Sequence, residues 1–290
     1  MAARRLSPAG GAAILALTTA FWGSSFVVIK QISAGMPASA ICMARFVIAA
    51  IALSPFIRFD RKVWRYGIEL STWLFAGYAT QAVALRYTTV NRCAFITATY
   101  VVFVPLLAAF YGHRVRGIVW AAAAIALGGC GLMCGEGGGP NVGDLWSLGT
   151  AITWSVYIFR IEAIAIRFQP LPLAISQLVP VALFSTGWFA ASPAHVTALH
   201  WPALIYLGLA ATAATTWLQA VAQQVVPSPQ AAVIFMLEPV FAVFFGYLML
   251  GERLAIRGII GAAMIIAAAI ASQIQPGSQS PTDTARERAG

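Results

Sequence analysis

Hydrophobic residues gather into ten long stretches that short polar segments separate. The stretches lie at about 10–32, 37–57, 69–87, 92–111, 115–134, 143–162, 171–191, 200–221, 229–250 and 255–273. They run for about 20 residues without the alternation of apolar and polar residues that membrane β-strands show. This length suits an α-helix that crosses a hydrocarbon layer roughly 30 Å thick. The pattern predicts an all-α integral membrane protein with ten transmembrane helices.

Composition supports a membrane protein. Hydrophobic residues make up 60% of the 290 residues and charged residues only 9%, whereas a soluble domain carries about 25% charged residues. A soluble fold of this length cannot remove so much apolar surface from water. These values argue against a soluble enzyme, a disulfide-stapled secreted module and a disordered chain. Only the polar segment 274–290 is predicted to be a disordered tail, on the cytoplasmic side.

The basic residues predict the orientation, because they accumulate on the cytoplasmic side of a membrane. With the N-terminus inside and ten crossings, 12 of the 18 Lys and Arg residues fall in inner segments and 5 in outer segments, while Arg45 lies within a span. Both termini are therefore expected to be cytoplasmic. The basic residues are scattered over several loops, which argues against nucleic-acid binding. Arg4 and Arg5 before an apolar run resemble a signal peptide, but the length of the run and its Trp22 and Lys30 favour an uncleaved first helix.

An internal repeat is visible when the chain is shifted along itself. A shift of 132 residues places Trp22 on Trp154 and Lys30 on Glu162. A shift of 139 places 94–96 on 233–235 and 112–114 on 251–253, and a shift of 141 places 116–118 on 257–259. The constant order predicts two five-helix units, 10–135 and 143–273. Because five crossings end on the side opposite their start, the second unit is predicted to be inverted, as in many secondary transporters.

Several short motifs point to a known family. They are Trp22-Gly23-Ser24-Ser25-Phe26, Arg45-Phe46, Glu238-Pro239 and Leu250-Gly251-Glu252-Arg253-Leu254. Together they resemble the drug/metabolite transporter superfamily, in its ten-span EamA-type branch, over about residues 12–272. The resemblance implies export of amino acids, other small metabolites or drugs, and the chain is most similar to aromatic-amino-acid exporters of bacterial inner membranes. The first half departs from the pattern, with Thr99-Tyr100 where the second half has Glu238-Pro239 and His113 where it has Glu252.

Polar and aromatic residues share helical faces in both halves. Thr18, Trp22 and Ser25 have the spacing i, i+4, i+7, and the shift of 132 maps them onto Thr150, Trp154 and Tyr157. Tyr78, Gln81, Thr97, Tyr100 and Trp217 extend this set. We expect these residues to line a cavity that holds a zwitterion with an apolar side chain. The alternatives are an aromatic belt at the membrane surface and hydroxyls that pack between helices.

Intramembrane charges and prolines are further candidates for function. Glu238 lies near the middle of its span and precedes Pro239, so it is suited to bind a substrate ammonium or to exchange a proton, and a structural carboxylate is the alternative. Arg45 lies roughly 12 Å into its span at 1.5 Å per residue. A structural role is favoured for Arg45, with substrate-carboxylate binding as the alternative. Pro105 and Pro180 are predicted to kink their helices and to hinge the halves.

Nothing in the sequence indicates a cofactor, a metal or an ATPase. There is no Gly-x-x-x-x-Gly-Lys-Ser/Thr loop and no His-Glu-x-x-His pattern, and Cys130 and Cys134 are expected to pack as small residues. The expected partners are a small-molecule substrate and the lipid bilayer, with a monomer favoured over a homodimer. The leading prediction is a secondary exporter of amino acids. Its rivals are a proton-coupled multidrug or nucleotide-sugar carrier and, more distantly, a membrane enzyme or a non-transporting receptor.

Overall fold

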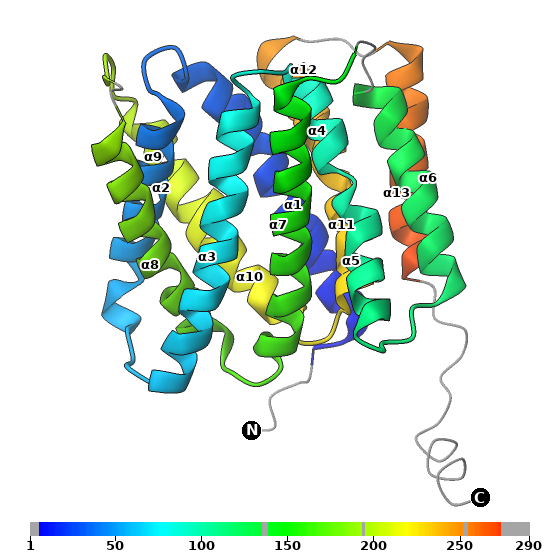
Figure 1. Ribbon diagram of the computed structural model, residues 1–290, viewed down its shortest axis with the longest axis horizontal. Coiled ribbons are helices and arrows are strands. Elements are labelled where there is room, and N and C mark those ends of the chain that lie inside the picture. Colours follow the sequence, from blue (N-terminus) through cyan, green and yellow to red (C-terminus); the bar gives the residue numbers. More distant parts are fainter. Residues whose placement is uncertain (1–5, 135–138, 193–194, 252–254, 274–290) are drawn as a thin grey trace, which may run out of the picture.

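The computed structural model describes residues 6–134, 139–192, 195–251 and 255–273, and in these ranges it is helical without strands (Figure 1). The helices are α1 (Pro8–Ile32), α2 (Ala38–Leu53), η1 (Ser54–Phe56), α3 (Arg61–Ala84), α4 (Val90–Thr97), α5 (Tyr100–Phe110), α6 (Gly117–Cys134), α7 (Val142–Ala165), α8 (Pro170–Ala191), α9 (Trp201–Gly208), η2 (Leu209–Ala214), α10 (Thr215–Ala222), α11 (Ser228–Phe235), α12 (Leu237–Leu250) and α13 (Ile256–Ser272). The tail 274–290 and the motif residues Glu252, Arg253 and Leu254 lie outside the described residues.

Each apolar stretch coincides with one helix or with consecutive helices, and most ends agree within a few residues. The main exception is α3, which begins at Arg61 rather than near residue 69. The side chain of Asp60 caps this helix by accepting hydrogen bonds from the backbone N–H groups of Lys62 and Val63. Hydropathy misses such a first turn because its residues are charged, although they favour helix formation as strongly as apolar ones.

Three of the stretches are interrupted. The fourth breaks between α4 and α5 at residues 98–99, and the ninth breaks between α11 and α12 at Met236. Pro239 then lies in the first turn of α12, where a missing N–H costs nothing. The eighth passes through η2, a π-helical segment with a wider turn. In contrast, α5 and α8 continue as helices through Pro105 and Pro180.

The chain has the helices of a multi-pass membrane protein. Within the described residues, seven segments are long and apolar enough to cross a membrane: Pro8–Ile32, Ala38–Phe56, Arg92–Phe110, Gly117–Cys134, Pro170–Ala191, Trp201–Ala222 and Ser228–Met249. Ile256–Ser272 is also apolar but shorter. The two remaining long helices, α3 and α7, carry ionisable side chains toward their ends.

The helices of the two halves are interleaved. Contacts join α1 to α10 and α12, α2 to α8, α9 and η2, α3 to α7 and α8, α5 to α7, and α6 to α13. Every one of these pairs takes one helix from residues 10–135 and one from residues 143–273. The first turn of α1 and the last turn of α13 lie at the same end of the bundle (Figure 1). The core therefore lies between the halves and not within either of them.

Glycines allow α6 and α13 to approach closely. A Cβ atom on Gly129 would lie 2.6 Å from the carbonyl oxygen of Gly261, and a Cβ atom on Gly261 would collide with the carbonyl of Gly129 in the same way. Small residues at a helix crossing let the backbones pack directly. This pair stands at the edge of the bundle in Figure 1, away from α3 and α8.

Ion pairs hold α7 to helices of the first half. Arg92 in α4 makes two hydrogen bonds to the carboxylate of Asp144, at 2.7 and 2.6 Å. Asp144 also closes a capping box with Asn141 at the start of α7. Farther along α7, Arg160 makes two hydrogen bonds to Glu69 in α3, at 2.5 and 3.0 Å.

Replacing Asp144 by Asn should lower the Tm by no more than about 4 °C, because an ion pair that water still reaches contributes little stability. Arg92→Gln should lower the Tm by a similar amount. The double variant should have a Tm no lower than that of the less stable single variant. Thermal unfolding of the three purified variants measures this coupling. Fully additive losses would mean that the two side chains act independently.

Candidate functional site

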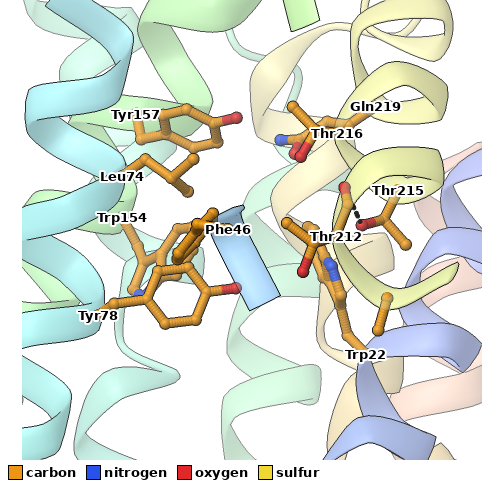
Figure 2. A pocket seen from close by; sticks show the side chains of 11 residues that line it. Trp22, Phe46, Leu74, Tyr78, Trp154, Tyr157, Thr212, Thr215, Thr216 and Gln219 are labelled. Carbon is orange, nitrogen blue, oxygen red and sulfur yellow. Dashed lines mark hydrogen bonds between the residues drawn. The ribbon is translucent and has the colours of Figure 1, made fainter. Parts of the chain in front are cut away.

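A cavity lies in the middle of the bundle, between helices of both halves (Figure 2). It is lined by Trp22, Phe46, Leu74, Tyr78, Trp154, Tyr157, Ala211, Thr212, Thr215, Thr216 and Gln219. Its empty space, with the open solvent at its mouth included, is about 240 Å³, and little of it admits a molecule of the size of water, so this conformation is a narrow one.

One wall of the cavity is aromatic. The ring of Tyr78 in α3 meets Trp154 in α7 at 5.5 Å and 69°, and it meets Phe46 in α2 at 5.2 Å and 83°. Trp154 in turn meets Tyr157 at 5.7 Å and 82°. Edge-to-face contacts of this kind are favourable and hold the rings in fixed orientations. The wall is therefore a preformed surface for an apolar or aromatic group.

Trp22 and Trp154, which the shift of 132 residues aligns, both line the cavity. Trp22 packs on Phe235 of α11, with ring centroids 5.2 Å apart. Trp154 packs over Gly77 of α3, where a Cβ atom would lie 3.1 Å from its Cε2 atom. Among the described residues, no hydrogen bond joins either indole N–H to a protein acceptor. Both indoles thus keep a donor for a ligand or for water.

The opposite wall is polar and comes from η2 and α10. The hydroxyl of Thr212 donates to the carbonyl of Leu207, five residues earlier, at 2.7 Å, and Thr215 donates to the carbonyl of Thr212 at 3.1 Å. Gln219 uses its amide to donate to Gln223 at 2.8 Å. Thr216 also lines the cavity, and its hydroxyl makes no hydrogen bond within the described part of the chain. A ligand between the two walls would meet rings on one side and hydroxyl groups on the other.

A buried cation stands directly behind this lining. Arg45 is only 3% exposed. Its Nε donates to the hydroxyl of Thr212 at 2.8 Å, and its Nη2 donates to the carbonyl of Ala211 at 3.0 Å. The guanidinium carbon lies 5.1 Å from the ring centroid of Tyr78, a favourable cation–π distance. Arg45 therefore connects α2 to the π-helical segment, and no carboxylate of the described residues lies within ion-pair distance of it.

Glu238 lies in the first turn of α12, just after the break at Met236. Its carbonyl oxygen would be 2.9 Å from a Cβ atom on Gly23, so α12 contacts α1 next to Trp22. Its side chain is partly buried and interacts electrostatically with Arg45 and Tyr78. Within the described residues the carboxylate makes neither a hydrogen bond nor an ion pair. Glu238 is thus an uncompensated acid beside the cavity, although it does not line the present space.

The structure brings together four of the expected cavity residues and places the hydroxyls elsewhere. Trp22, Tyr78, Trp154 and Tyr157 line the cavity. The hydroxyls of Thr18, Ser25 and Thr150 are buried and donate to carbonyls of their own helices, at 2.9, 2.7 and 3.0 Å. A hydroxyl on an intramembrane helix can satisfy itself on the preceding turn. The i, i+4, i+7 spacing therefore identified the inward helical face but not the groups that reach the cavity.

Four other expected residues do not line the cavity. Gln81 is half-buried in α3, while Thr97 and Tyr100 are buried at the break between α4 and α5. Trp217 is 42% exposed and does not line the cavity, so the shift of 139 residues, which places Tyr78 on Trp217, does not relate these two side chains.

The glycine contacts explain the misplacement of Trp217. Gly67 of α3 packs against Ser176 of α8, and Gly208 of α9 packs against Ile48 of α2. A shift of 141 residues places Gly67 of α3 on Gly208 of α9, so the two glycine contacts are equivalent in the two halves. The same shift places Tyr78 on Gln219, which lines the cavity.

The residues of the polar wall were not predicted from the sequence. They are Thr212, Thr215, Thr216 and Gln219. Their signal is the run Ala-Thr-Ala-Ala-Thr-Thr at 211–216, which puts three hydroxyls in the middle of an apolar stretch. Helical spacing alone does not reveal that a π-helical segment rotates this run toward the cavity.

The chain has relatives among known transporters. The model of the EamA-like transporter family matches residues 10–135 and again residues 141–272. An uncharacterized transporter of Archaeoglobus fulgidus is 31% identical over 271 residues, which cover 88% of this chain and 83% of that protein. A probable terminal-alkyne amino-acid exporter of Streptantibioticus cattleyicolor is 27% identical over 273 residues, covering 87% of this chain and 90% of that protein. A solved crystal structure aligns with a TM-score of 0.77 at 18% identity and covers 96% of this chain and 99% of that one, which shows a shared fold.

Proposed function

The chain belongs to the EamA-like transporter family, and we propose that it is a secondary transporter that exports amino acids with aromatic or other apolar side chains, or related small metabolites. The cavity in Figure 2 carries this proposal. The protein is a multi-pass membrane protein, and we assign it to a bacterial-type inner membrane.

The chemistry of the cavity supports an amphipathic substrate. The hydroxyl of Tyr78 points into the space between the walls (Figure 2) and makes no hydrogen bond with the described residues. The hydroxyl of Thr216 and the indole N–H groups of Trp22 and Trp154 likewise make no hydrogen bond with the described residues. Polar groups inside a membrane protein need partners, because an unmade hydrogen bond is costly there. A molecule with a polar head and an apolar side chain would satisfy these donors and lie against the aromatic wall.

Alternating access between two inverted halves is the mechanism that we propose. In this proposal the chain crosses the membrane ten times as two five-helix units, 10–135 and 143–273, with both termini cytoplasmic. The packing supports it, because exchanging the halves turns the pair α1–α10 into α7–α3 and the pair α1–α12 into α7–α5, while α2–α8 and α6–α13 map onto themselves. The narrow cavity would then widen toward one side of the membrane at a time.

Flux measurements in proteoliposomes test this function. The purified full-length chain should accelerate the movement of labelled phenylalanine, and unlabelled apolar amino acids should compete. Empty liposomes and liposomes that hold the heat-denatured protein serve as controls. If a panel of amino acids shows no flux above these controls, the proposed substrate class is wrong.

A proton-coupled carrier of lipophilic cations is the second candidate, and Glu238 is the observation that favours it. A carboxylate beside aromatic rings suits such a cation. Arg45, Tyr78 and Tyr100 are the charged or titratable groups that interact with it, and Arg45 opposes a cationic substrate. Transport of a quaternary-ammonium dye in preference to phenylalanine would support this candidate over the amino-acid exporter.

Glu238→Gln tests the part that protons play. If Glu238 carries the coupling proton, the variant should still move phenylalanine down its own gradient but should lose the response of flux to an imposed pH gradient. Gln230→Met, an uncharged change in the neighbouring α11, serves as the control and should keep the response. An unchanged response in Glu238→Gln would mean that the carboxylate does not carry the proton.

A further inference from the structure

We propose that Arg45 and Glu238 recognise the two charged ends of a zwitterionic substrate, with Arg45 binding the carboxylate and Glu238 the ammonium. This inference rests on the proposed function and assigns the chemistry of the ligand in the same cavity. The two side chains come from different halves of the chain, Arg45 from α2 and Glu238 from α12. Each lies next to residues that line the cavity.

Some N–H groups of Arg45 are available to donate hydrogen bonds to a ligand. Only Nε and Nη2 make hydrogen bonds, to Thr212 and Ala211, and its other N–H groups have no acceptor among the described residues. Both of these partners line the cavity. A guanidinium group binds a carboxylate through two parallel hydrogen bonds, which are stronger than hydrogen bonds between neutral groups. A substrate carboxylate at the Thr212 side of the cavity would therefore find a partner that the protein itself leaves open.

Glu238 supplies the opposite charge from the other half of the chain. The contact of its backbone with Gly23 places it beside Trp22, whose indole lines the cavity. Its carboxylate has no hydrogen-bond or ion-pair partner in the described structure. It interacts electrostatically with Arg45, with Tyr78, which lines the cavity, and with Tyr100, which does not. A substrate ammonium near Trp22 would thus meet a carboxylate.

The separation of the two charges is the central observation. Arg45 and Glu238 act on each other electrostatically, yet they do not form an ion pair. Charges inside a membrane protein are costly, and they either pair with each other or mark a substrate pathway. A zwitterion between them would give each charge a partner without changing the net charge of the site. A lipophilic cation would leave Arg45 uncompensated, and a simple carboxylate would leave Glu238 uncompensated.

The aromatic wall completes the recognition of such a substrate. The guanidinium group of Arg45 lies over Tyr78, whose hydroxyl points into the cavity. From there the edge-to-face rings of Phe46 and Trp154 continue the wall. An amino acid held at its two charges would direct its side chain onto these rings. The site therefore selects for α-amino acids with apolar or aromatic side chains.

Binding of three related molecules tests the inference. We would measure the affinity of the purified full-length protein for phenylalanine, for phenethylamine, which lacks the carboxylate, and for 3-phenylpropionate, which lacks the ammonium. Wild type should bind each half-analogue at least about 10-fold more weakly than phenylalanine, since one charge-assisted interaction contributes about that much. Arg45→Gln should lose the preference over phenethylamine and keep the preference over 3-phenylpropionate. Glu238→Gln should show the reverse pattern.

Controls separate recognition from a structural role. Arg45→Lys keeps the charge and should keep part of the preference over phenethylamine, whereas Gln230→Met removes an uncharged hydrogen-bonding group from α11 and should leave both preferences unchanged. Equal weakening of all three ligands in Arg45→Gln or Glu238→Gln would overturn the inference. So would wild-type protein that binds a half-analogue as tightly as phenylalanine, a result that needs no variant to fold. If wild type binds neither phenylalanine nor any other amino acid, the proposed function itself fails.

Discussion

Trp154→Ala should reduce phenylalanine flux by at least about 10-fold while the protein stays folded. The indole of Trp154 makes edge-to-face contacts with Tyr78 and Tyr157, and aromatic pairs contribute about 0.5–1.5 kcal/mol each beyond their burial. Truncation removes two such pairs and the surface against which the substrate side chain would lie. Flux in proteoliposomes, together with the Tm of the detergent-solubilised protein, measures both effects.

Trp146→Ala is the matched control for this variant. Trp146 belongs to the same helix, α7, but it is 40% exposed and does not line the cavity. Its replacement should leave flux within about 2-fold of wild type, because surface substitutions have small effects. If Trp154→Ala transports as well as Trp146→Ala, the aromatic wall is not part of the substrate path.

Gly23→Ala should destabilise the protein and nearly abolish transport. A Cβ atom at this position would lie 2.5 Å from the Cβ of Phe241 and 2.8 Å from the backbone nitrogen of Ala242. Backbone atoms cannot move aside as a flexible side chain can, so α1 and α12 must separate. Overpacking of this kind costs about 1–3 kcal/mol. It would also displace Glu238, whose carbonyl oxygen meets the same position.

Gly187→Ala is the control for Gly23→Ala. Gly187 lies within α8, and a Cβ atom there would have no neighbour within 4 Å. Alanine favours the helix over glycine by about 1 kcal/mol, so the Tm of Gly187→Ala should rise or stay unchanged. Thermal unfolding of both variants and of wild type measures these Tm values. Equal Tm values for Gly23→Ala and wild type would contradict the close packing of α1 on α12.

The helices could be predicted from the sequence because apolar length is a strong signal. It located every apolar stretch, but it placed the start of α3 too late, since the first turns of that helix are charged. The breaks in the helices were harder to place. The break before α12 lies next to Glu238-Pro239, whereas Pro105 and Pro180 lie within helices that continue. The π-helical segment accepts a hydrogen bond from Arg45 through Thr212, a tertiary contact that no local pattern reveals.

The candidate site could be predicted only in part, for a similar reason. Helical periodicity and the internal repeat predicted Trp22 and Trp154 as cavity-lining residues, because a large aromatic side chain on an inward helical face extends toward the space between the helices. Hydroxyls such as that of Thr18 donate hydrogen bonds to carbonyls of their own helix, so helical spacing does not predict whether they reach the cavity. Trp217 was misplaced because an offset of two residues rotates a helix by about 200°. Repeats in helical proteins must therefore be aligned residue by residue before their side chains are compared.

Protection of single cysteines by substrate tests the central claim most directly, namely that both halves of the chain line one substrate cavity. Leu74→Cys in α3 and Thr216→Cys in α10 put a thiol on each side of the cavity, in a variant whose four native, buried cysteines are replaced by alanine. Leu199→Cys, in the exposed segment before α9, is the control. We predict that saturating phenylalanine slows maleimide labelling of both cavity thiols and leaves position 199 unchanged. Protection of only one cavity position, or of neither, would contradict a shared cavity.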